Sequence, residues 1–151
     1  MKGSPVRVAT GTVGSTQVQI TYGSPGVKGR IIWGGLVAYD KVWVTGAHQA
    51  TKINFTGPVT VAGKQIAAGD YAFFTIPGRD KWVLILNKNH TQHLADNYNE
   101  GEDIARVEVT PKPGNDTVQR LTYSVKNETD TQGAIVVQWE NLEVALPFTT
   151  R

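Results

Sequence analysis

The sequence predicts an all-β protein, an antiparallel β-sandwich or a flattened, jelly-roll-like barrel of about ten short strands. Glycine and proline punctuate the whole chain, with 16 and 7 residues, and the runs between them are rich in β-branched and aromatic residues. No stretch has the apolar spacing of an amphipathic helix. The polar segment 92–103 is expected to be a loop, with at most one short helical turn near residues 92–100.

Four segments show the two-residue alternation of half-buried antiparallel strands. Segment 16–22, TQVQITY, places Val18, Ile20 and Tyr22 on one face and polar residues on the other. Segments 105–111 (ARVEVTP), 120–126 (RLTYSVK) and 142–148 (LEVALPF) repeat the pattern. A strand over 134–140 is expected to precede the last of these, with ENLEV joining the two.

Two further segments, YAFFTI (71–76) and WVLIL (82–86), are apolar on both faces. They are expected to be central strands covered on both sides. The turn residues PGRD between them predict a hairpin. TGP (56–58) and AGKQ (62–65) predict further tight connections.

Chain length predicts one β-sandwich domain over residues 8–148, between a flexible N-terminal tail (1–7), read as a trimmed-leader remnant, and a C-terminal tail (149–151). The absence of cysteine excludes disulfides, Cys-ligated zinc and Cys nucleophiles. The 15 basic and 13 acidic residues give a net charge of +2 with no dense Lys/Arg run, which argues against nucleic-acid binding. No apolar run reaches the roughly 18 residues of a membrane span.

Catalytic motifs do not emerge from the sequence. The glycine-rich segment 22–30 lacks the spacing of a phosphate loop and is not followed by a helix. Neither G-x-S-x-G nor H-E-x-x-H occurs. No catalytic residue is therefore assigned, and a non-catalytic role is favoured over an enzyme.

Histidine and carboxylate residues offer one candidate metal site. His90 and His93 form H-x-x-H, Asp96 follows, and His48 could approach them across a sandwich. On a helical turn both rings could face one divalent ion such as zinc, whereas on a strand they would point to opposite faces. A solvated polar loop that binds no cofactor is the competing interpretation.

Aromatic residues beside glycine turns offer a candidate ligand site. Trp33 precedes two glycines and Trp43 precedes the Thr45–Gly46 turn, so both could form apolar pocket walls. Trp82 and Trp139 lie at strand positions whose side chains are predicted to point inward, so they are expected in the core. The candidate ligand-binding set is Trp33, Tyr39, Trp43, Thr45, His48 and Gln49.

Several segments together resemble an uncharacterised bacterial family, domain-of-unknown-function family 2911. They are SPGVKGRIIWGGLVAYDKVWVTGAHQAT, VAGKQIAAGDYAFFTIPG, WVLILNKN, EDIARVEV and WENLEVALP. The resemblance implies an all-β domain from Bacteroidetes-type bacteria, exported to the periplasm or outer envelope behind a leader. It implies no activity.

The chain departs from the family pattern W-R-T-G-A-N-E-A-T at Val44, His48 and Gln49. The family Arg and Glu are both replaced by uncharged residues. One interpretation is that the two formed an ion pair that this chain has lost. The other is that a charged functional site has been lost or changed here. His93 stands where the family more often carries Trp. These departures argue against a family-wide histidine mechanism.

Three hypotheses for function remain open. The favoured one is a non-catalytic exported binding module for a carbohydrate, another small polar ligand or an envelope partner. The second is a metal-assisted hydrolase that uses His48, His90 and His93. The third is a structural, oligomeric envelope protein. The chain itself is expected to be a monomer or weak homo-oligomer.

Overall fold

The computed structural model describes residues 4–47, 49–88 and 98–150, and for residues 115–116 it describes the backbone alone. This part of the chain is all-β, with a single short 3-10 turn, η1. The elements are β1 (Val6–Val13), β2 (Thr16–Gly23), β3 (Thr51–Phe55), β4 (Val59–Val61), β5 (Lys64–Ile66), β6 (Gly69–Ile76), β7 (Trp82–Asn87), η1 (Glu100–Glu102), β8 (Asp103–Val109), β9 (Lys112–Asn127) and β10 (Gln132–Thr149).

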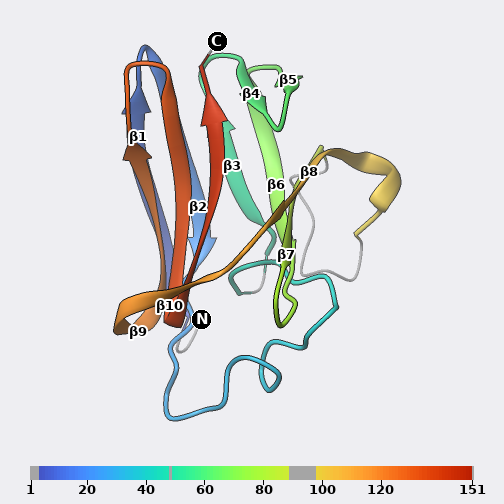
Figure 1. Cartoon of the computed structure of the whole chain (residues 1–151), viewed down its shortest axis with the longest axis vertical. Helices are drawn as coiled ribbons and strands as arrows, with labels where there is room; N and C mark the ends of the chain where they lie inside the picture. The colour runs from blue at the N-terminus through green and yellow to red at the C-terminus, as the bar shows by residue number, and fades with distance from the viewer. Residues whose placement is uncertain (1–3, 48, 89–97, 151) are drawn as a thin grey trace.

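The strands form two antiparallel sheets, which confirms the predicted sandwich. One sheet has the order β1-β2-β3-β6-β7-β8 and the other β5-β4-β10-β9. Figure 1 shows the long β9 and β10 running alongside β1 and β2. The described strands do not close into a barrel.

The main core lies between the sheets, where the alternating residues meet. Val18, Ile20 and Tyr22 of β2 are buried, as their phase predicts. Leu121 and Tyr123 of β9 join the same apolar cluster from the opposite sheet. Burial of such side chains is the main favourable contribution to folding.

The hairpin β6–β7 is confirmed as the central, doubly covered pair. Phe73 and Leu84 face the main core, whereas Phe74 and Ile85 belong to a second apolar cluster on the other face of the sheet. Residues of segment 42–50 cover that second face. Continuous apolar runs are what a strand with no solvated face requires.

The last strand differs from the prediction of two strands joined by ENLEV. β10 is continuous from Gln132 to Thr149. Glu140 has a left-handed φ of 54°, and the register with β9 shifts on both sides of it. A bulge of this kind bends a strand without ending its pairing.

Between β2 and β3, the described residues 24–47 and 49–50 contain no strand, and this long segment covers the lower end of the sandwich (Figure 1). Isolated bridges tie it down, including one from Gly26 to Arg120 of β9 and one from Trp43 to Thr75 of β6. The segment thus contacts both sheets. No helix among the described residues is long and apolar enough to cross a membrane.

Candidate binding groove and the predicted site residues

A groove of about 310 Å³ lies on the outer face of the six-stranded sheet, over β1, β2 and β3. This volume is at the lower end of the range of small-molecule sites. Its side chains point outward from alternate strand positions. The polar ones are Thr10, Thr12, Gln17, Gln19, Asn54 and Thr56.

Strand register assembles these residues into two rungs. Thr10 lies opposite Gln19, which lies opposite Asn54 on the next strand. In the second rung, the backbone N–H of Gln17 donates to the Thr56 hydroxyl at 2.8 Å. The groove is therefore a regular array of side chains on paired strands.

Gly11 explains how β1 approaches the opposite sheet beneath the groove. A Cβ atom at this position would lie 2.5 Å from Cβ of Val125 on β9. Because glycine has no side chain, β1 can lie closer to β9 here than it could with any other residue at position 11. Gly11 therefore allows β1 to pack directly against Val125 of β9.

The groove is lined by neutral hydrogen-bonding groups. Its lining, all in the described part of the chain, includes no charged residue and no aromatic ring. Asn54 is oriented because its Nδ2 donates to the Asp70 carboxylate at 2.8 Å, which leaves Oδ1 as an acceptor. Hydroxyl and amide groups both donate and accept, as ligand hydroxyls do.

The four tryptophans of the chain lie together in one cluster, including Trp33 and Trp43. Trp33 lies 5.2 Å from Trp82 and 6.0 Å from Trp139 between ring centroids. Trp43 stacks on Trp139 at 5.9 Å. Trp82 and Trp139 are buried, as predicted, while Trp33 and Trp43 are half-buried and pack on the core. The Trp33 and Trp43 rings thus pack against the buried rings of Trp82 and Trp139.

Three other predicted ligand residues have different surroundings. Thr45 is fully buried, and its hydroxyl hydrogen-bonds with that of Thr75 at 3.0 Å. Tyr39 is half-buried beneath the guanidinium of Arg79, 4.6 Å from the ring centroid. Gln49 is exposed. None of the three lines the groove on β1–β3.

Val44 gives a physical reason for one departure from the family pattern. It is buried in the second apolar cluster with Ala50 and Phe74. An apolar residue there needs no partner, whereas an arginine would need a compensating charge.

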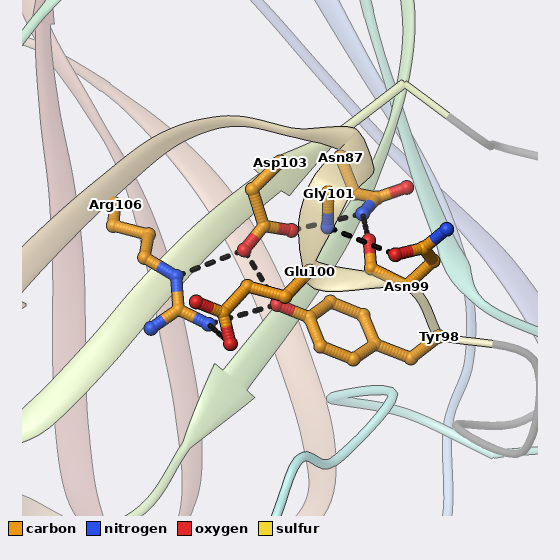
Figure 2. A network of polar contacts seen from close by, with 7 residues as sticks. All are labelled: Asn87, Tyr98, Asn99, Glu100, Gly101, Asp103 and Arg106. Carbon is orange, nitrogen blue, oxygen red and sulfur yellow. Dashed lines mark hydrogen bonds and ion pairs between the residues drawn. The ribbon is translucent and has the colours of Figure 1, made fainter.

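A polar network joins the end of β7 to residues 98–106 at the start of β8 (Figure 2). Asp103 accepts hydrogen bonds from Asn87 at 2.8 Å, from Arg106 at 2.8 Å and from the Tyr98 hydroxyl at 2.5 Å. The guanidinium of Arg106 also donates to the Tyr98 oxygen at 2.9 Å. Asn87 further donates to the carbonyl of Asn99 at 3.1 Å. The Asp103 carboxylate thus accepts hydrogen bonds from three donors. The network is suited to holding these side chains in place rather than to proton transfer.

Tyr98 is held as a neutral phenol in this network. Burial, followed by the hydrogen bond to Asp103, raises the pKa of Tyr98 to about 12. Its ring also packs edge-on against Phe74, with centroids 5.0 Å apart. Beside them, the backbone N–H of Lys88 donates to the carbonyl of Glu102 at 3.0 Å. Both ends of the connection are thus joined.

The four predicted metal ligands, His48, His90, His93 and Asp96, lie outside the described residues. Within the described residues no group of three His, Cys, Asp or Glu side chains could hold a metal ion.

The groove residues carry no motif that marks them in the sequence. The alternation placed Gln17 and Gln19 outward, but an outward polar residue ordinarily faces solvent. A usable signal was present in TGT (10–12) and TQVQITY (16–22), where every outward position is neutral. Only strand pairing shows that these positions are neighbours.

The fold and the groove define a β-sandwich domain with a neutral hydrogen-bonding surface on one sheet. The chain matches the family model described as protein of unknown function (DUF2911) over residues 4–148 and therefore belongs to that family. This confirms the resemblance seen in the sequence. No curated protein and no solved structure matches the chain.

Proposed function

We propose that this protein is a non-catalytic binding module for a neutral, hydroxylated ligand, with a carbohydrate as the favoured class. The observation that carries the proposal is the groove on β1–β3, lined by six hydroxyl and amide side chains. A sugar offers many hydroxyls that both donate and accept. An array of Thr, Gln and Asn side chains can satisfy them without burying an unpaired charge.

The lining of the groove argues against sugar hydrolysis at this surface. Glycoside hydrolysis uses two carboxylates on either side of the scissile bond. The groove residues, which all belong to the described part of the chain, include neither Asp nor Glu. Asp70 lies beside the groove and orients Asn54. The groove therefore supplies recognition without an acid–base pair.

Affinity at this groove should be weak, with Kd on the order of millimolar. The lining residues, all described, contain no aromatic ring on which a sugar could stack. The exposed Gln17 and Gln19 must also lose side-chain freedom when they bind. A weak site suits polymeric ligands that present many identical units.

The proposal is tested by NMR titration of labelled protein with neutral gluco-, xylo- and manno-oligosaccharides, and with polygalacturonate as an anionic contrast. We expect shifts in the amides of β1–β3 with at least one neutral oligosaccharide and none with the polyanion. Gln19→Ala and Thr12→Ala should each weaken binding about 2- to 10-fold, the loss of one net hydrogen bond.

Gln65→Ala on β5 is the matched control, because Gln65 is also exposed but lies outside the groove. This variant should bind as the wild type does. Equal loss in Gln65→Ala, or no shift on β1–β3 with any neutral oligosaccharide, would contradict the proposal. Export to the cell envelope, which the family resemblance implies, is kept as part of the proposal and is tested by fractionating cells that express the native gene.

A further inference from the structure

Residues 24–47, the covering segment, lie at the lower end of the sandwich in Figure 1. This segment carries two large apolar side chains that are exposed to solvent. Ile31 is 77% exposed and Leu36 is 51% exposed. The backbone N–H of Leu36 donates to the carbonyl of Ile31 at 3.0 Å, which holds the two residues next to each other. A pair of large apolar side chains held outward on one turn needs a specific explanation.

The turn that carries this apolar pair is anchored firmly. Ile32 and Val37, the next residues along the chain, are buried and joined by a backbone hydrogen bond of 2.9 Å. Gly35 passes so close that a Cβ there would lie 2.4 Å from the carbonyl oxygen of Ile31. Because the inward residues fix the turn, Ile31 and Leu36 cannot fold back into the core.

Basic residues flank the apolar pair along the chain. Lys28, Arg30 and Lys41 are exposed, and Asp40 is the single acidic residue of segment 28–41. Three basic residues against one acidic residue leave a charge of +2, the same as the excess of the whole chain. Arg30 is also held in place, since its guanidinium donates to the carbonyls of Val27 and Gly26.

The neighbouring β6–β7 turn adds to this surface. The backbone N–H of Asp40 donates to the carbonyl of Pro77 at 2.7 Å, and Arg79 lies over the ring of Tyr39. The turn also carries Asp80 and Lys81, so its three charged residues leave a net charge of +1. Both the segment that holds Ile31 and Leu36 and this turn are therefore positively charged.

We infer that this end of the molecule docks on an anionic phospholipid surface. Ile31 and Leu36 enter the boundary between headgroups and acyl chains, while Lys28, Arg30 and Lys41 contact lipid phosphates. Interfacial binding of this kind combines a buried apolar area with attraction between basic side chains and anionic lipids. Two apolar side chains are few for a stable protein interface, which buries about 1,200–2,000 Å² in total.

Sedimentation with vesicles tests the inference. The full chain is mixed with vesicles of phosphatidylcholine alone or of phosphatidylcholine with phosphatidylglycerol. We expect partition onto the anionic vesicles that falls as salt is raised. Ile31→Ser with Leu36→Ser should reduce the partition coefficient about 10-fold or more. Lys28→Gln and Lys41→Gln should each reduce it roughly 5-fold.

Two matched variants control for general apolarity and charge. Val8→Ser removes an apolar side chain that is 55% exposed on β1, and Lys64→Gln removes an exposed lysine on β5. Both should partition as the wild type does. All the replaced side chains are exposed, so every variant should keep the wild-type melting temperature.

Three results would overturn the inference. The first is a lack of partition onto anionic vesicles, and the second is an equal loss in the Val8→Ser and Lys64→Gln controls. The third is a concentration-dependent dimer in light scattering that the Ile31→Ser, Leu36→Ser variant abolishes, because the apolar pair would then be a contact between copies of the chain.

Discussion

The hydroxyl of Tyr123 on β9 donates a hydrogen bond of 2.5 Å to the backbone carbonyl of Thr45. Thr45 has a left-handed φ of 57° and is fully buried. The hydroxyl of Thr51 donates to the same carbonyl at 3.1 Å. A side chain of the four-stranded sheet thus holds the covering segment where that segment enters β3 of the other sheet.

Replacing Tyr123 by Phe should destabilise the protein by about 1–2 kcal/mol, because a buried hydrogen bond is lost. In a chain of this size the melting temperature should fall by roughly 2–8 °C. Tyr71→Phe is the control: its hydroxyl donates to the carbonyl of Ala67 at 2.7 Å, but in an exposed setting. Thermal unfolding followed by circular dichroism compares the two. An equal or larger loss in Tyr71→Phe would show that the Tyr123 bond does not secure the segment.

Two buried tryptophans provide a second comparison. Trp139 donates from Nε1 to the carbonyl of Gln119 at 3.1 Å, whereas Nε1 of Trp82 is buried without a hydrogen-bond partner among the described residues. Trp139→Phe removes a bond, while Trp82→Phe removes an unsatisfied donor. We expect Trp139→Phe to be the more destabilising by about 1–2 kcal/mol in urea unfolding. Both side chains are at most 2% exposed, so lost packing should be similar. Equal losses would mean that the Trp82 donor is satisfied.

Gly11 should tolerate no side chain. Gly11→Ala brings a Cβ within 2.5 Å of Val125, and the cost of overpacking is about 1–3 kcal/mol. Adding Val125→Gly should reduce the penalty of the alanine, which a double-mutant cycle measures as a coupling energy. Gly26→Ala is the control, because the nearest atom to a Cβ there lies at 3.6 Å. The idea fails if Gly11→Ala unfolds at the same urea concentration as Gly26→Ala.

Tyr98 should make the protein sensitive to alkali. The pKa of Tyr98 is raised from 10.0, the ordinary value of a tyrosine, to about 12 in the folded protein, so folding favours the neutral phenol. This contribution to stability is fully present below pH 10 and is lost as the pH rises to 12. In Tyr98→Phe, the unfolding free energy should fall less steeply between pH 10 and pH 12.

Ultraviolet titration of phenolate gives an independent check on Tyr98. The wild type should show one more late-titrating tyrosine than Tyr98→Phe does. Tyr123 remains in both proteins, and its pKa is also raised well above 10.0, by burial. An unchanged number of late-titrating tyrosines in Tyr98→Phe would contradict the network in Figure 2.

Strand positions were predictable because they depend on local alternation. Val18, Ile20 and Tyr22 fall at every second residue, and that spacing alone places them on one face. The continuity of β10 was not predictable. It depends on pairing with β9 on both sides of Glu140, a contact between residues distant in the sequence.

The sequence by itself determined that this protein is an all-β sandwich with a doubly covered central hairpin, because side-chain alternation and turn chemistry are short-range properties. Only the tertiary structure decided the position of the neutral groove. Thr10, Gln19 and Asn54 become neighbours through the register of three strands, and Gly11 permits the close approach beneath them. The tertiary structure also gathered four tryptophans into one cluster and turned Ile31 and Leu36 outward. These features depend on which distant segments come into contact. The local sequence pattern of a segment does not show which other segment it packs against.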